Sequence, residues 1–225
     1  MNNPNALLYK WLVINSFATL LVYVAWLQGW LALVIESDAS YLSLVMAALF
    51  FVFWVISGYQ TVTVNREIVR FETNSSEGTA SSYFKKLRIK SEKLGGRTLD
   101  QSMLASALRV RLMMPIQILH YVANMLILLG LIGTVVGFVI AVAGLGDSLA
   151  GGENLQRVQG VLGQIVNGMG VALFTTLVGA ILGGLWLQLH YQLLEKAIAG
   201  FVVDVVEYAD IELIPELTCA GEKSA

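Results

Sequence analysis

The sequence predicts an all-α membrane protein with four transmembrane helices. The chain has 225 residues, of which 56% are hydrophobic and only 13% are charged. A soluble domain carries about a quarter charged residues, so this composition indicates a chain that lies mostly in lipid. Backbone amides in lipid must be satisfied within the segment, and the apolar segments lack the alternation of a membrane β-barrel. The spans are therefore predicted to be helices.

Four apolar segments reach or approach the roughly 20 residues that a membrane helix needs. We expect them at residues 11–35, 41–58, 116–145 and 166–194. They divide the chain into a cytoplasmic N-terminus (1–10), a first transmembrane hairpin (11–58), a cytoplasmic helical segment (59–115), a second hairpin (116–194) and a cytoplasmic C-terminal helix and tail (195–225).

The basic residues indicate the orientation of these spans. Of the 14 Lys and Arg residues, only Arg157 lies in a loop on the opposite side from the rest. Loops rich in Lys and Arg stay in the cytoplasm, so both termini and residues 59–115 are predicted to be cytoplasmic. The other basic residues are Lys10, Arg66, Arg70, Lys85, Lys86, Arg88, Lys90, Lys93, Arg97, Arg109, Arg111, Lys196 and Lys223.

The cytoplasmic parts are predicted to be helical extensions of the spans. Residues 60–72 continue the second span, and residues 74–82 read as a turn before a short basic helix, YFKKLRIKSEKL. That helix could bind anionic lipid or another protein, but a solvated basic face is favoured. Asp100 is a candidate N-cap for a helix that begins at Gln101 and enters the third span. The fourth span is expected to continue as a helix to Pro215.

Sequence motifs for catalysis, for a cofactor and for nucleic-acid binding are missing. The sequence has no phosphate-binding loop, no zinc-ligand spacing and no metalloprotease motif. His120 and His190 are far apart in sequence, near predicted membrane edges, and ordinary packing is favoured over a functional pair. Cys219 is the single cysteine. We therefore expect no enzyme activity, no cofactor, no metal other than a transported ion, and no nucleic-acid partner.

Small residues and threonines recur at helical spacing in the third and fourth spans. One interpretation is close packing of helices through glycine and alanine, and the other is a polar path that two such stripes share. A threonine hydroxyl can donate and accept hydrogen bonds, so it can order water or replace part of a cation's hydration shell. The stripes are Gly130, Thr134, Gly137, Ala141 and Gly144 in the third span, and Gly168, Ala172, Thr176, Gly179 and Gly183 in the fourth.

All 16 acidic residues lie outside the predicted spans, and so do all the basic ones. Proteins that conduct protons or cations nearly always have an ionisable group at membrane depth. If this chain conducts an ion, another chain must therefore supply the carboxylate.

The stretches LGLIGTVVGFV and GMGVALFTTLVGAILG closely resemble the MotA/TolQ/ExbB family, the ring subunits of ion-driven motors in the bacterial inner membrane. The resemblance implies a homopentamer whose third and fourth spans line a central pore. It also implies a dimer of a single-span MotB-, TolR- or ExbD-like partner in that pore, whose aspartate carries the ion. Thr134 and Thr176 then correspond to pore-facing threonines, and the small residues of the motif are Gly130, Gly133, Gly137, Ala172 and Gly179.

Three features distinguish this chain within the resemblance. Four spans resemble MotA rather than the three of TolQ and ExbB, and Val171 stands where those two have a glutamate. The middle segment is shorter than that of flagellar MotA. The doublet of Thr175 and Thr176 resembles sodium-driven relatives, so Thr134, Thr175 and Thr176 form a possible sodium path although a proton is the first choice. A membrane scaffold held by glycine packing, without ion conduction, is the alternative function.

Overall fold

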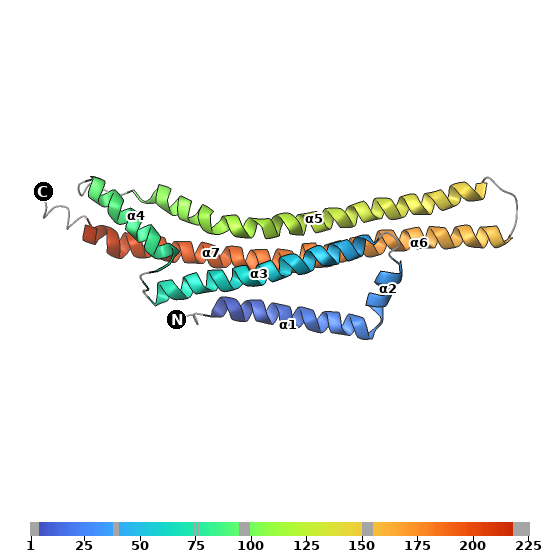
Figure 1. Cartoon of the computed structure of the whole chain (residues 1–225), viewed down its shortest axis with the longest axis horizontal. Coiled ribbons are helices and arrows are strands. Elements are labelled where there is room, and N and C mark those ends of the chain that lie inside the picture. The colour runs from blue at the N-terminus through green and yellow to red at the C-terminus, as the bar shows by residue number, and fades with distance from the viewer. Residues whose placement is uncertain are drawn as a thin grey trace. The chain divides into compact units, whose positions relative to one another are not determined.

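The computed structural model describes residues 5–37, 41–73, 75, 77–94, 100–149 and 155–217, and no strand occurs among them. The all-α prediction is confirmed for these residues (Figure 1). Arg97, Cys219 and Lys223 lie outside them. The elements are α1 (Ala6–Leu27), α2 (Trp30–Ser37), α3 (Leu42–Glu72), α4 (Thr79–Leu94), α5 (Ser102–Leu149), α6 (Leu155–Gly179), the π-helical segment η1 (Ala180–Leu187), α7 (Gln188–Tyr208) and the π-helical turn η2 (Ala209–Leu213).

Four helical stretches are long and apolar enough to cross a membrane, which confirms the predicted number of spans. They are Ala6–Leu27, Leu42–Glu72, Ser102–Ala143 and Gln159–Leu217. The last three run well beyond the predicted spans into polar sequence, so the second, third and fourth spans continue as helices, as expected.

The first span is shorter than predicted, because the apolar run of residues 11–35 does not form one helix. α1 ends at Leu27, and Gly29 has a φ of 75° with its N–H donating to Trp26 O at 3.0 Å. Glycine adopts this left-handed backbone without the strain that a Cβ would cause, so it ends the helix. A single glycine inside an apolar run gave no such signal in the sequence.

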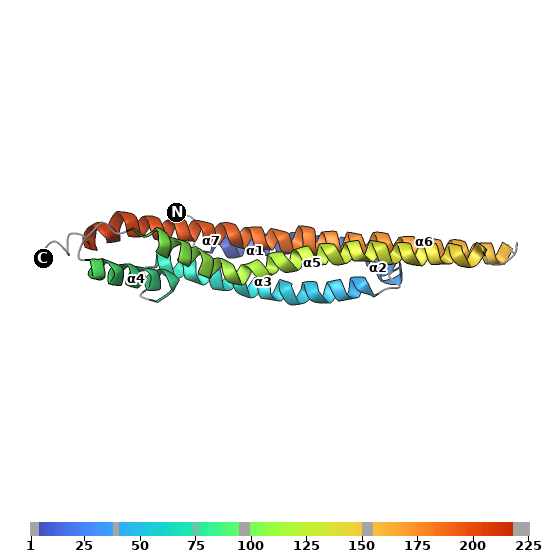
Figure 2. The ribbon, with the colours of Figure 1, turned by 90° about the horizontal axis from the view of Figure 1, so that it is seen from above.

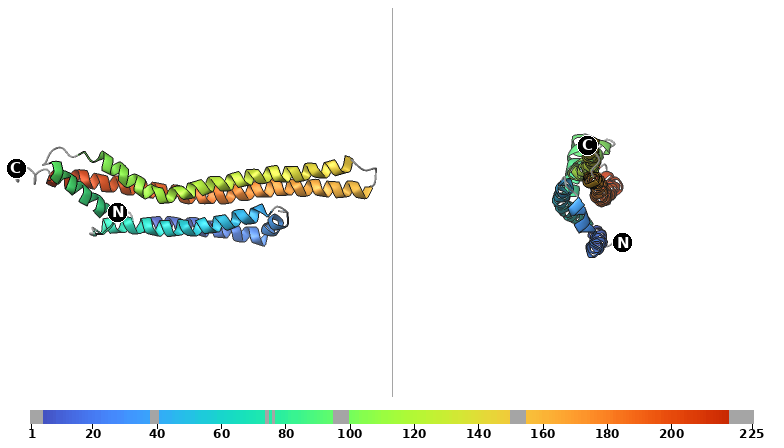
Figure 3. Two further views of the ribbon diagram at one scale, coloured as in Figure 1. Left: turned by 45° about the horizontal axis from the view of Figure 1, so that its top comes forward. Right: turned by 90° about the vertical axis from the view of Figure 1, so that its right-hand side faces the viewer.

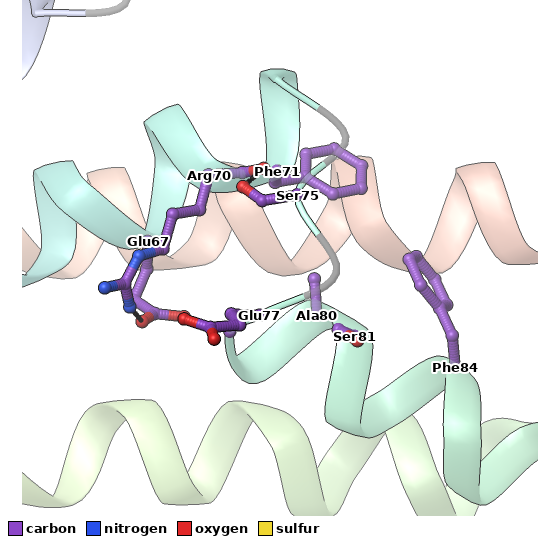
Figure 4. A pocket seen from close by; sticks show the side chains of 9 residues that line it. Glu67, Arg70, Phe71, Ser75, Glu77, Ala80, Ser81 and Phe84 are labelled. Atoms are coloured by element: carbon purple, nitrogen blue, oxygen red, sulfur yellow. Dashed lines mark hydrogen bonds and ion pairs between the residues drawn. The ribbon is translucent and has the colours of Figure 1, made fainter.

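The turn before α4 is also shorter than the predicted 74–82, because α4 begins at Thr79. The Glu67 carboxylate explains this start: its Oε2 accepts a hydrogen bond from the backbone N–H of Thr79 at 2.6 Å. Figure 4 shows the same carboxylate beside the Arg70 side chain. A carboxylate at a helix N-terminus accepts a hydrogen bond from a free N–H group and interacts favourably with the positive end of the helix dipole. The Oε1 atom of Glu67 pairs with Arg70 at 3.1 Å, which holds the carboxylate in place.

Asp100 acts at the start of α5 as predicted, although the helix begins one residue later, at Ser102. Its Oδ1 accepts the Ser102 N–H at 2.9 Å. That backbone hydrogen bond lowers the pKa of the Asp100 carboxyl below its ordinary value.

The helices form two compact units, of which the first comprises residues 1–13, 57–118 and 191–225. Its centre is aromatic: Phe71 on α3 packs edge-to-face against Phe201 and Tyr208 on α7, with ring centroids 5.8 and 5.9 Å apart. α4 joins this core through Tyr83, whose hydroxyl donates to Gln101 Oε1 at 2.8 Å. Burial, and secondarily the charge of Asp210, raise the pKa of Tyr83. This packing explains why the segment between the second and third spans folds as helices.

The second unit comprises residues 14–56 and 119–190 and contains the hairpin of α5 and α6. The two helices lie side by side (Figures 1 and 2), and they stay paired along the hairpin (Figure 3, left). A Cβ on Gly179 would lie 2.6 Å from Leu126 O, and one on Gly183 would lie 2.6 Å from Ala123 O. Since no Cβ fits there, glycine permits contact between the two backbones.

The π-helical segment η1 keeps one face of the fourth span against α5. The buried positions of the fourth span recur every four residues, whereas an α-helix turns once per 3.6 residues and drifts by about 40° at each such step. The wider turn of η1, which holds the last two of these positions, counteracts this drift. The buried positions are Val171, Thr175 and Gly179 in α6, and Gly183 and Leu187 in η1.

Two adjacent glycines test this packing. A Cβ on Gly183 would lie 2.6 Å from Ala123 O and 2.7 Å from Leu126 Cβ, but one on Gly184 meets only Ile127 Cδ1, at 3.5 Å. We expect Gly183→Ala to lower the stability of the purified protein by about 1–3 kcal/mol, as overpacking does. Gly184→Ala should leave it unchanged or slightly raised. Thermal unfolding in detergent measures both, and equal stability of the two variants would contradict the packing.

Candidate functional site

The small residues of the third span lie against the fourth span of the same chain. Gly130 faces Thr175 O and Thr176 Cα, at 3.1 and 3.2 Å from an ideal Cβ. A Cβ on Gly133 would overlap the Thr175 side chain, and one on Gly137 would overlap the Ala172 and Gly168 backbones. Packing within the hairpin therefore accounts for these glycines, which by themselves do not indicate a pore.

Thr175 lies inside this interface. Its side chain is 0% exposed and is in contact with Gly133. Its hydroxyl donates to Val171 O, one turn earlier on α6, at 2.7 Å. Within one chain, the geometry gives Thr175 a packing role.

Thr134 and Thr176 differ from Thr175 because both reach the surface of the hairpin. Thr176 is exposed, and its Oγ1 lies 3.0 Å from both Gly130 O on α5 and Ala172 O on its own helix. Thr134 is half-buried and donates to Leu131 O. Each hydroxyl proton is used on a carbonyl, so the oxygen lone pairs can accept from water or face a cation.

The contacts between α5 and α6 place the three threonines at one level of the hairpin. Gly133 touches Thr175, and Thr134 follows Gly133 directly in the chain. Thr134 also lines an open groove together with Val135, Phe138, Met169 and Ala172. The groove offers one hydroxyl among apolar side chains, and the sequence has no Asp, Glu, Lys or Arg within residues 116–145 or 166–194.

His190 is the centre of a buried polar network in the second unit. The ring is 0% exposed; its Nδ1 lies 2.8 Å from Trp186 O and its Nε2 lies 3.0 Å from Asn15 Nδ2. Trp54 Nε1 donates to Asn15 Oδ1 at 2.7 Å. A carbonyl can only accept, so Nδ1 carries the hydrogen and the ring is neutral in this arrangement. The network joins α1, α3 and α7, which the sequence alone did not indicate.

His120 has a more open environment. It is half-buried on α5, with Nδ1 at 3.2 Å from Gln188 Oε1 and Nε2 at 3.2 Å from Asn124 Nδ2. The spacing of His120 and Asn124, one helical turn, was the available signal in the sequence. The contact with Gln188 had none, because 68 residues separate the pair. Among the described residues, no group of three or more His, Cys, Asp or Glu side chains could hold a metal ion.

The Asn15 network gives a testable prediction. Asn15→Ala removes a partner from both His190 and Trp54, so we expect a loss of about 1–2 kcal/mol in stability, in the range found for hydrogen bonds between membrane helices. Thr19→Val is the matched control, because the Thr19 hydroxyl bonds only within α1, to Asn15 O at 2.8 Å. Thermal unfolding of the two purified variants measures their losses of stability, and we expect the larger loss for Asn15→Ala. Equal losses would show that the network adds nothing beyond a bond within one helix.

Comparison with known proteins identifies one family. The profile of the MotA/TolQ/ExbB proton channel family matches residues 83–206, which is more than half of the chain and includes the whole hairpin of α5 and α6. A comparison with curated proteins gave no match. A comparison with solved structures gave none either. The resemblance predicted from the two glycine- and threonine-containing stretches is confirmed by the profile match, and the chain belongs to the MotA/TolQ/ExbB proton channel family.

Proposed function

We propose that this chain is the ring subunit of a motor in the bacterial inner membrane that converts a proton gradient into rotation. Five copies surround a central pore, with both termini in the cytoplasm. Membership of a proton channel family supports conduction, and the distribution of basic residues supports the orientation. The pentamer follows from the family resemblance.

The surface hydroxyls of Thr134 and Thr176 are the observation that carries this proposal. Both residues lie at the same level of the hairpin, in spans that contain no Asp, Glu, Lys or Arg. A polar side chain is unfavourable against lipid but not against water or protein, so polar residues in a span usually face a bundle interior or a cavity. This face of the hairpin therefore lines the pore, and the glycines behind it hold the two helices together.

The partner supplies the acid that this chain lacks. A hydroxyl does not bind and release protons near neutral pH, so Thr134 and Thr176 can order water or stabilise a charge but cannot carry it. A dimer of a single-span protein with a membrane aspartate, of the MotB, TolR or ExbD kind, provides the missing group in the pore.

The position of Thr175 favours a proton over sodium. A sodium ion that leaves water needs several oxygen ligands, whereas a proton can move along ordered water. The Thr175 hydroxyl is buried and donates to Val171 O, so only two of the three threonines present oxygen atoms at the surface. Sodium remains the second candidate because of the threonine doublet, and it requires that Thr175→Ala abolish activity.

The alternative of a membrane scaffold accounts for the glycines but only in part for the threonines. Close packing explains Gly133, Gly137 and Gly179, whose side-chain positions are filled by the neighbouring helix. The Thr176 hydroxyl also joins the two helices through Gly130 O, but the scaffold gives no reason for the Thr134 hydroxyl, which donates to Leu131 O on its own helix. The two functions are therefore separated by changing the surface threonines and leaving the glycines intact.

We expect the double variant Thr134→Val, Thr176→Val to lose at least about tenfold of ion-driven activity, because methyl groups replace hydroxyls on the path. Thr175→Val is the matched control: it has the same change in chemistry, inside the interface, and should keep activity within about threefold. Proton uptake by vesicles that hold ring and partner measures both, with assembly checked by size-exclusion chromatography. Full activity of the double variant would return the threonines to a packing role.

The ring without its partner should conduct little. Since the spans contain no acidic residue, the purified chain in vesicles is expected to give a proton or sodium flux near that of empty vesicles. Adding a single-span partner with a membrane aspartate should raise the flux, and imaging of the complex should show five copies of this chain around two of the partner. Strong flux through the chain alone would contradict the need for a borrowed carboxylate.

A further inference from the structure

Histidine is the side-chain type whose ordinary pKa lies closest to neutral pH, and this chain has two, His120 and His190. They differ in access. His190 is 0% exposed and enclosed by the Asn15 and Trp54 network, whereas His120 is half-buried at the surface of the helix that carries Thr134. A proton moving along this surface can reach His120 but not His190.

The hydrogen bonds of His120 leave it ready to accept a proton. The amide oxygen of Gln188 can only accept, so the Nδ1 atom, 3.2 Å away, carries the hydrogen, with the amide orientation as assigned. The Nε2 atom then has a lone pair, which accepts from Asn124 Nδ2 at 3.2 Å. Asn124 is exposed, so its amide can rotate and present its oxygen to a newly formed Nε2–H.

His120 lies on the same side of α5 as Thr134. The two residues are 14 positions apart, which corresponds to about 1400° of helix rotation and a rise of about 21 Å. That rotation is about 40° short of four full turns, so the two side chains leave the helix in similar directions. On the facing helix, Thr176 reaches Gly130 O and Gln188 reaches His120, so both of these residues also point toward α5. The hairpin therefore has two polar groups of side chains, with apolar residues between them. One is the surface pair Thr134 and Thr176, and the other is His120 with its partners Gln188 and Asn124.

We propose that His120 is the proton acceptor on the cytoplasmic side of the ring, a role that rests on the proposed function above. The partner's carboxylic acid loses its proton to water ordered by Thr134 and Thr176. Water in the pore passes a proton over the remaining distance to Nε2 of His120, and the Asn124 amide rotates to accept the new N–H. The imidazolium then releases that proton from Nε2 to cytoplasmic water, which restores the neutral ring and leaves no net change in the chain.

The test replaces the imidazole with a group that keeps hydrogen bonding but cannot take a proton. In vesicles holding ring and partner, His120→Gln should lower the proton flux at least about tenfold. Imidazole added on the cytoplasmic side should restore part of that flux. Asn124→Ala is the comparison variant: it keeps the imidazole and removes only the amide that receives the new N–H, so it should lower the flux by less than His120→Gln does. If His120→Gln does not assemble, His120→Asn takes its place.

Wild-type flux from the Gln variant, failure of imidazole to restore an assembled ring, or a flux carried by sodium alone would overturn the role of His120. The first two outcomes leave the proposed function intact, because the wild-type complex still conducts only with its partner. A flux carried by sodium alone would also replace the proton by sodium in the proposed function. A wild-type complex without any partner-dependent flux would remove the proposed function and this role together.

Discussion

The direct contact between the backbones of α5 and α6 is the constraint on which the rest of the structure depends. Lipid gives helices no hydrophobic reason to associate, so packing and interhelical hydrogen bonds must hold them. Glycine at 130, 133, 137 and 179 brings the two helices close enough for the Thr176 hydroxyl to reach Gly130 O. The same closeness leaves room for only one threonine, Thr175, inside the interface. Thr134 and Thr176 lie at the open side of the hairpin, which is where the proposed ion path requires them.

The sequence predicted the fold class, the number of spans and the family, because each depends on many residues at once. Composition and hydropathy identify lipid-embedded helices from any of several segments, and the paired glycine and threonine stretches are specific together. The errors came from single residues. One glycine with a positive φ ended α1 at Leu27, and one distant carboxylate, Glu67, started α4 early.

The candidate site was predictable only in part. Periodicity showed that Thr134 and Thr176 share stripes with glycines, but it could not decide which members of a stripe face a neighbouring helix and which face outward. Thr175 and Thr176 show the difference: they are adjacent in the chain, but Thr175 is buried between the helices and Thr176 is exposed. The contact of His120 with Gln188 depends on how two helices pair over 68 residues, and no local pattern encodes it. In the proposed function, these residues are the ring's contribution of two hydroxyls and an imidazole, and the partner contributes the acid.

The π-helical segment η1 has a consequence for how this chain is compared with its relatives. A π turn has the geometry of an α-helix into which a residue has been inserted while the helix on either side keeps its partners. A homologue with an unbroken α-helix would therefore place its counterpart of Gln188 one residue nearer to its threonine. An alignment without a gap inside Ala180–Leu187 would then match every later position of the fourth helix to the wrong neighbour. Residues such as His190 would then look unconserved only because the alignment is shifted by one position.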